Sequence, residues 1–599
     1  MLLRRFLQFS PGCRARFVAA ACCPFASLAQ TSSTSDDLVL LPPFIVEERI
    51  EGPSWRYASV PGFEILTRCH DAKSRALAES FYRAHHVHRA LLPARFEMQL
   101  DVPVALIFYD ENLWPVELQE SAAAFLGLQN FSFPQTRAAP GDPTPLDRWL
   151  GRAPMSDPSR PRATAGSTPA APKPHTFLTD LRLSSADSIH IFTLAPSGHD
   201  HLFRTYLRPT YLAQLLAGRT PSLPSWFLTG FLNTYGQMEF GGEAITLPPF
   251  VWLTPEDTKI ARDEPAAATR EFLPLVDLLG ENAALLASRT AREHQIAHAQ
   301  LELLVRWALD PRAPDRRDRF WTLVERACTE PVTPELISIT LGLDPAALLA
   351  ELAQFLPDAL RRSQRWAIEL IAYPDFEFRP ATSAEIARLR GDWERLEARY
   401  AATAAPDTVE KYRSQSLRTL RNAYDRGEHA PALLAVLGLS ELEAGNIAAA
   451  TDHLAFATRH RVVRPSAYVE LARLLLQVHV SQATERSRPL TIGEAREVLD
   501  LLYVARRQHP LLPDVFRLAA HTWNACATPP APDDLAFLLD APAHFPRSAE
   551  LSYHAARFAL AADDAPRAAR IADAALQLGA SDAFTPRLIE FRANLASPK

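Results

Sequence analysis

From residue 382 onward, small and apolar side chains recur at the spacing of an amphipathic helix. Thr382 and Glu385 have the spacing of a capping box, in which each side chain bonds the backbone N–H of the other residue, and they predict a helix through Tyr400. A further helix is expected from about Asp407 to Tyr424. Glycine makes up only 21 of 599 residues, which favours helices over a tightly turned β-fold.

One segment of this helical region has the spacing of a two-helix repeat. Counted from Pro431, Gly438 falls where the first helix needs a small residue, and Gly445 falls where the turn needs a left-handed backbone. Pro465 stands one repeat period after Pro431, where the next helix should begin. The second helix would pack through Ala450, Leu454 and Ala457.

This pattern resembles tetratricopeptide repeats, which are stacked pairs of antiparallel helices. Residues 549–579 carry alanines at the same mutual offsets, whereas 466–508 and 513–540 fit less well, and Val462 stands where the family has its closing proline. The resemblance implies a solenoid of tetratricopeptide-like helical repeats over 407–595 that binds a protein or peptide partner. An ordinary helical bundle is the alternative.

The 599 residues exceed what one hydrophobic core usually serves, so two to four domains are expected. Asp71 opens a predicted helix that runs to about Leu92, between apolar runs that are typical of strands. These runs lie at 44–47, 55–57, 63–68, 102–109 and 188–194. Further helices are expected at 203–217, 223–237, 282–309, 318–328 and 345–355. The sequence therefore predicts an α+β domain over 41–365 and a connecting helix over 366–406, in a chain dominated by helices.

A proline-rich segment interrupts the α+β domain. Residues 136–176 contain nine prolines among Ala, Ser, Thr and Gly, a composition that cannot bury enough apolar surface to become ordered. We expect a disordered insertion at this point. The segment is not interpreted as a domain boundary, because another apolar strand follows at 188–194.

A short motif in the second half of this domain carries a second resemblance. Pro224, Trp226 and Gly230 open a predicted helix, and the helix upstream of it includes Leu207–Tyr211. The order of strands, helices and motif resembles zinc peptidases of the gluzincin, peptidase-MA-like kind. In those enzymes an HExxH helix precedes Pro-x-Trp-x-x-Glu-Gly, two His and a downstream Glu hold zinc, and the Glu of HExxH activates water.

The functional positions of that motif are occupied by other residues in this chain. Leu207 and Tyr211 stand at the two His positions, Arg208 at the catalytic Glu and Thr229 at the ligand Glu. The resemblance therefore implies a pseudoenzyme with no catalytic residues, no zinc and no cofactor. The alternative is a metal-dependent hydrolase with a rearranged site.

Other histidines offer weaker signals for such a site. His294 and His298 have the i, i+4 spacing of a zinc-binding helix, but no catalytic Glu lies between them, and we expect a solvated helix face. His199 and His201 lie in a loop just before the degenerate helix. A polar face of the first helix is expected to contain His85, His86 and His88.

The first 29 residues have the pattern of a signal peptide. Phe17–Leu28 is apolar, and Ala29 follows as a small residue at the expected cleavage site. The basic region that precedes this apolar stretch consists of Arg4, Arg5, Arg14 and Arg16. Ala19–Cys22 resembles a bacterial lipoprotein box, which would place a lipid anchor on Cys22. Residues 30–40 would then form a loose linker in a periplasmic or cell-envelope protein.

Charge and composition restrict the partner. Without the leader, 59 basic residues face 69 acidic ones, a net charge of −10, which gives no electrostatic reason to bind nucleic acid or an anionic membrane. No later run is long enough for a transmembrane helix. The leading hypothesis is an exported, non-catalytic pseudopeptidase that binds a polypeptide through its repeats. A structural component of the envelope is a second alternative.

Overall fold

The computed structural model describes eight stretches of the chain, all within one compact unit, Gly52–Lys599. They are residues 54–110, 180–195, 209–240, 244–280, 289–368, 372–404, 406–580 and 582–596. The expected leader, linker, first strand and proline-rich insertion lie outside the described residues.

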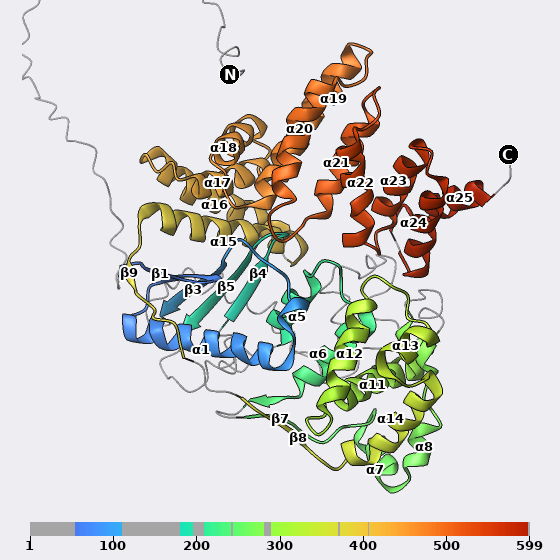
Figure 1. Cartoon of the computed structure of the whole chain (residues 1–599). Helices are drawn as coiled ribbons and strands as arrows, with labels where there is room; N and C mark the ends of the chain where they lie inside the picture. Colours follow the sequence, from blue (N-terminus) through green and yellow to red (C-terminus); the bar gives the residue numbers. More distant parts are fainter. Residues whose placement is uncertain are drawn as a thin grey trace, which may run out of the picture. The chain divides into compact units, whose positions relative to one another are not determined.

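A six-stranded sheet forms the first part of the unit (Figure 1). Its order is β4-β5-β3-β2-β1-β9, and the central strand β3 pairs in parallel with both β2 and β5. Every residue of β3 is buried, which explains why this strand is a continuous apolar run instead of an alternating one. The strands are β1 (Arg56–Val60), β2 (Phe63–Thr67), β3 (Val104–Asp110), β4 (Asp180–Ser184), β5 (Ile189–Ala195) and β9 (Arg379–Pro380).

Helices cover both faces of this sheet (Figure 1). α1 (Asp71–Leu91) connects β2 to β3, and its Phe81 belongs to the same core as Ile65 of β2. α15 (Ser383–Ala404) covers the opposite face, where Trp393 packs with Ile107 of β3. The N-terminal part is therefore an α+β region in which α15, far away in sequence, supplies one of the two covering layers.

A helical body follows the sheet and shares its hydrophobic core. It contains α5 (Pro209–Ala217), α6 (Ser225–Gly236), α7 (Pro255–Asp263), α8 (Pro265–Thr269), α9 (Leu275–Leu279), α11 (Ala291–Ala308), α12 (Pro314–Arg326), α13 (Pro334–Leu341) and α14 (Pro345–Ala359). A second sheet joins β6 (Glu239–Phe240), β7 (Ala244–Leu247) and β8 (Gln364–Ala367). In the described part of the chain no single helix is long and apolar enough to cross a bilayer; α13 and α14 meet that test only as a pair bent by 61°.

The remaining helices form antiparallel pairs, so the chain contains a helical-repeat region. The first helix of each pair contacts the first helix of the next, from α15 through α17, α19, α21 and α23 to α25. The pairs are α15 with α16 (Val409–Asp425), α17 (Pro431–Glu443) with α18 (Ile447–Arg459), α19 (Pro465–Glu485) with α20 (Ile492–Ala505), α21 (Pro513–Asn524) with α22 (Pro532–His544), and α23 (Ala549–Ala561) with α24 (Ala565–Gln577). α25 (Thr585–Ala596) ends the stack.

The stack begins with α15, one helix before the expected start of the repeats at residue 407. α15, expected as a connecting helix, crosses α16 at Gly391, where an added Cβ would lie 2.5 Å from the Leu420 side chain. The same close approach recurs between α17 and α18, at Gly438 and Leu454. α15 therefore belongs both to the repeat region and to the covering layer of the sheet.

One edge of the repeat region contacts the N-terminal part. The loops that precede α19, α21 and α23 each supply a contact: Arg464 pairs with Asp187 at 3.3 Å, and the His509 N–H donates to the Asp101 carboxylate at 2.7 Å. Arg547 donates to backbone carbonyls just after α12, at 2.8 and 3.0 Å. These three contacts come from the loops between helix pairs, and they add to the packing of α15 on the sheet.

Candidate functional site

The motif positions of the suspected peptidase site are only partly described. Leu207 and Arg208 lie outside the described residues. Tyr211 is buried in α5, with its ring 5.5 Å from Phe81 and 5.9 Å from His88, both on α1. Burial raises the pKa of the Tyr211 hydroxyl, so the phenol stays neutral. This side chain therefore packs α5 against α1.

The retained motif residues lie at a close contact between α6 and α11. Pro224 is the N-cap residue of α6, and Trp226 is buried against an aromatic ring of α12. A Cβ on Gly230 would lie 2.6 Å from the carbonyl oxygen of Leu301, so the two helices meet where only glycine fits. Thr229, beside Gly230, is half-buried. Helix packing therefore accounts for Pro224, Trp226 and Gly230 without a metal.

The expectation of a polar face on the first helix is wrong for His88, which is fully buried. It follows Phe81 and Ala84 on the stripe of α1 that packs into the core, and this long-range packing decides its burial. Burial lowers the pKa of His88 well below its usual value, and lowers that of His85 to about 4. His86 is half-buried. Among the described residues, neither ring nitrogen of His88 has a hydrogen-bond partner.

The other expected histidine positions do not form a cluster. His294 is exposed and His298 is half-buried on α11, whereas His199 and His201 lie outside the described residues. Among the side chains that the structure describes, one group of three could hold a metal, and it lies in the repeat region. It consists of His521, Glu550 and His554.

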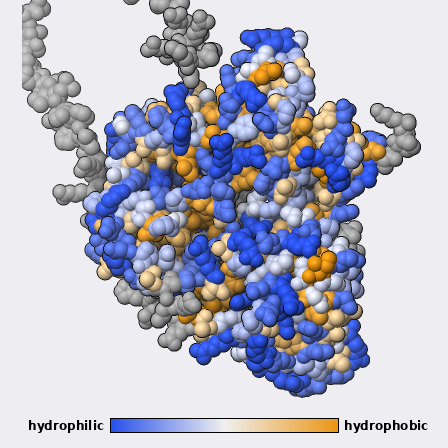
Figure 2. Space-filling view, in the orientation of Figure 1, coloured by the Kyte–Doolittle hydropathy of each residue, from blue (hydrophilic) through white to orange (hydrophobic). Residues whose placement is uncertain are grey.

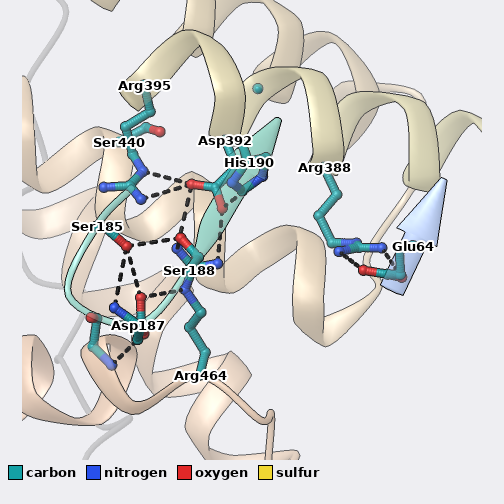
Figure 3. A network of polar contacts seen from close by, with 12 residues as sticks. Glu64, Ser185, Asp187, Ser188, His190, Arg388, Asp392, Arg395, Ser440 and Arg464 are labelled. Carbon is teal, nitrogen blue, oxygen red and sulfur yellow. Dashed lines mark hydrogen bonds and ion pairs between the residues drawn. The ribbon is translucent and has the colours of Figure 1, made fainter. Parts of the chain in front are cut away.

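A buried polar network joins the sheet to the repeat region (Figure 3). Asp392 of α15 accepts hydrogen bonds from Arg395 at 2.7 Å and from Arg464 at 2.8 Å. Arg464 also donates to Ser188 at 3.1 Å and pairs with Asp187, in the loop between β4 and β5. Burial opposes ionisation of Asp392, but Arg464 and Arg395 outweigh it and hold the pKa of this carboxyl far below its usual value.

The network contains Ser, His and Asp side chains, but its geometry is that of a structural contact. His190 lies 3.6 Å from Asp392 and is buried, and burial lowers its pKa to about 4. Ser188 is completely buried and accepts a hydrogen bond from Arg464, so its oxygen is not presented to a substrate. The arrangement fixes the first repeats on the sheet.

The residues expected to pack the repeats lie between α17 and α18. A Cβ on Gly438 would meet the Leu454 side chain at 2.8 Å, and Gly445 has a φ of +82° in the turn. Ala450, Leu454 and Ala457 have no exposed surface. These residues set the distance between the two helices and the turn that joins them.

A surface pocket of about 330 Å³ lies over the last repeats. Leu539 and Pro542 of α22 and Ile571 of α24 give it apolar walls, and Arg567 and Arg570 of α24 lie at its rim. Its lining also includes two further polar residues, Ser552 of α23 and Thr329 of the helical body. Ser552 is fully buried, and in the described part of the chain its hydroxyl has no hydrogen-bond partner.

Two arginines at this pocket carry charges that no described carboxylate pairs. Within the described residues, neither Arg567 nor Arg570 forms an ion pair. Other arginines of the repeats pair with buried carboxylates, as Arg496 does with Asp534 at 2.6 Å. Figure 2 shows hydrophilic residues over most of the visible face, with hydrophobic residues in small separate patches. That face therefore offers small apolar patches surrounded by polar groups.

Sequence reasoning missed both the pocket and the triad of His521, Glu550 and His554. The two histidines stand 33 residues apart, about one repeat period, so an alignment of the repeats would have placed them on neighbouring first helices. The pocket has no such signal, because its lining comes from three repeat helices and from Thr329, more than 200 residues earlier.

Comparison with known proteins adds little to this geometry. No protein-family model matches the sequence, and no curated protein matches it. Solved structures with some similarity include a thermophilic TPR protein of Thermus thermophilus, with 16% identity and a TM-score of 0.24 over 34% of this chain and 98% of that one. YrrB, a TPR protein with an unusual peptide-binding site, has 12% identity and a TM-score of 0.25 over 33% and 90%. A MamA double mutant has 13% identity and a TM-score of 0.23 over 32% and 94%.

Proposed function

We propose that this protein binds a polypeptide partner through its helical repeats and does not act on it chemically. The observation that carries the proposal is the pocket beside α24, where two arginines without an ion-pair partner among the described residues stand next to an apolar wall. Stacked helical repeats expose extended surfaces of this kind and use them for binding.

The lining of the pocket selects for one kind of peptide. Arg567 and Arg570 favour a carboxylate, from an acidic side chain or from a chain end. Leu539, Pro542 and Ile571 favour a small apolar side chain next to it. The volume of about 330 Å³ suits one or two side chains at the lower end of known ligand pockets. We infer an acidic–apolar segment of a partner protein as the ligand.

A peptide array provides the test. Wild type and an Arg570→Glu variant are compared on acidic–apolar peptides, with Arg459→Glu as a control that makes the same change of charge on an exposed residue of α18. A lost charge-assisted hydrogen bond corresponds to roughly 1.5–3 kcal/mol, so Arg570→Glu should weaken binding by at least about tenfold. Equal binding by all three proteins would refute the proposed site. Peptides recovered uncut support a non-catalytic role, whereas cleaved peptides would refute it.

The pseudopeptidase interpretation is a proposal of the same kind. It is supported by Tyr211 and Thr229 at positions where zinc peptidases have ligands, and by Tyr211 being packed as a core side chain. Export is also a proposal, supported by the basic and apolar leader over residues 1–29. Mass spectrometry of the native N-terminus tests it, and an intact Met1 would contradict it.

A further inference from the structure

His521, Glu550 and His554 bring three potential metal ligands together on the first helices of two neighbouring repeats. His521 lies in the last turn of α21, and Glu550 and His554 lie one turn apart on α23. One ligand atom from each side chain lies within 4.8 Å of the other two. Imidazole and carboxylate groups in a two-to-one ratio form a common ligand set for zinc.

His554 shows that this group is more than a chance proximity. It is buried, with an exposed fraction of 6%, and among the described residues neither of its ring nitrogens has a hydrogen-bond partner. Buried polar atoms without a partner are uncommon and point to a group that the polypeptide does not supply. Since His521 is exposed and its ring lies 5.5 Å from that of His554, a small ligand can enter between the two rings.

We propose that His521, Glu550 and His554 form a site for a divalent transition-metal ion such as Zn²⁺, which links α21 to α23. Tetrahedral ligands at 2.0–2.1 Å from a zinc ion lie roughly 3.3 Å from one another, so ligand atoms that lie up to 4.8 Å apart must approach by up to about 1.5 Å. The exposed His521 side chain can supply this movement by a change of rotamer. A fourth position remains for water or for a group of a partner.

The surroundings of Glu550 suit this role. Arg517 donates to one oxygen of Glu550 at 2.7 Å, which orients the carboxylate and leaves its second oxygen for the ion. Arg517 is also paired with Asp514 at 2.6 Å, so it shares its charge between two carboxylates.

Two further arginines, Arg557 and Arg587, lie over the rings of Tyr553 and Phe584 at 5.7 and 5.0 Å. They add positive charge to this face, and they limit the affinity that a cation can reach.

The site is independent of the proposed peptide pocket. Glu550 and His554 lie four positions apart and share one side of α23, whereas Ser552, between them, lines the pocket beside α24. The metal links adjacent first helices and thereby sets their spacing. It therefore fixes the curvature of the last repeats, and it needs neither the suspected peptidase motif nor the peptide ligand.

Zinc titration of the purified full chain, stripped of metal with a chelator, tests the proposal. One Zn²⁺ per chain is expected, together with a higher melting temperature in its presence. Loss of an outer-sphere partner of a metal weakens binding by about 10–100-fold, so loss of a direct ligand in His521→Ala should weaken it by at least about 100-fold. His544→Ala, on α22, is the control that leaves the triad intact and should bind zinc like wild type.

Further variants keep the result interpretable. His521 is exposed, so His521→Ala should fold even if His554→Ala does not. Glu550→Gln removes the negative charge but keeps the shape of the side chain and its contact with Arg517. Both should lose the visible absorption of tetrahedral Co²⁺ that wild type is expected to show. Absence of zinc binding by wild type would overturn the proposal, as would binding that is unchanged in His521→Ala. Binding of inorganic phosphate instead of zinc would show that the arginines make it an anion site.

Discussion

Arg464 offers the most direct test of how the repeats are held on the sheet. Its guanidinium is buried and contacts Asp392 at 2.8 Å, Ser188 at 3.1 Å and Asp187 at 3.3 Å. Arg464→Met keeps the length of the side chain and removes its charge. Removal of one partner of a buried ion pair costs about 3–5 kcal/mol, because the other charge stays buried.

The contacts that remain in Arg464→Met narrow the expected loss of stability. Asp392 keeps Arg395, which donates to it at 2.7 Å, and Asp187 keeps the backbone N–H of Ser466 at 2.8 Å. Each carboxylate keeps a hydrogen-bond donor, so the expected loss of stability lies in the lower half of that range, at about 3–4 kcal/mol. His190 cannot compensate, because burial lowers its pKa to about 4 and leaves it neutral at pH 7.

Urea unfolding followed by tryptophan fluorescence measures this loss. Trp393 is a suitable reporter, because it stacks on Phe192 of the sheet with ring centres 5.3 Å apart. The control is Arg473→Met on α19, the helix that follows Arg464; the Arg473 side chain is 42% exposed and pairs with Glu470 and Asp514. An exposed pair of this kind contributes roughly 0–1 kcal/mol. If Arg464→Met costs no more than Arg473→Met, the buried network does not hold the two parts together, and the reasoning is refuted.

Two other substitutions test separate features. Burial raises the pKa of Glu97 from 4.5 to about 7. The protein therefore loses stability as pH rises from about 4.5 to above 7, because the buried carboxyl must then ionise. Glu97→Gln should stabilise the protein by up to about 3 kcal/mol at pH 8 and should leave its stability unchanged at pH 4.5. Urea titrations at both pH values decide this, and equal effects at the two would contradict it. Ala450→Trp should lower the stability of the protein by roughly 1–3 kcal/mol, because the larger side chain forces α17 and α18 apart. Ala448 is exposed, so Ala448→Trp should not have this effect. Equal melting temperatures of the two variants would show that the helices are not closely packed at Ala450.

The sequence predicted elements well where the pattern is local. The strand expected at 102–109 is β3 (Val104–Asp110), and the one expected at 188–194 is β5 (Ile189–Ala195). The capping box of Thr382 and Glu385 is confirmed, with backbone-to-side-chain hydrogen bonds of 2.9 and 3.2 Å. In each case the signal is the residue spacing itself, which requires no knowledge of distant partners.

Features that depend on distant partners were not predictable. β9 has two residues, and it is a strand only because Arg379 and Pro380 pair with β1, more than 300 positions earlier. The polar network unites Asp187 with Arg464, and no short motif relates residues so far apart. His88 was misplaced for the same reason, since helical spacing alone could not show that its side of α1 faces the core.

The pocket over the last repeats suggests what the N-terminal part contributes under the proposed function. Thr329 reaches the pocket from the helical body, just beyond the carbonyls of Ala327 and Cys328 that Arg547 of the repeat region binds. Arg547 therefore links the loop before α23 to the segment that carries Thr329. Under the proposed function, the N-terminal part completes a binding surface of the repeats, and a domain that serves in this way keeps its fold without needing a catalytic residue.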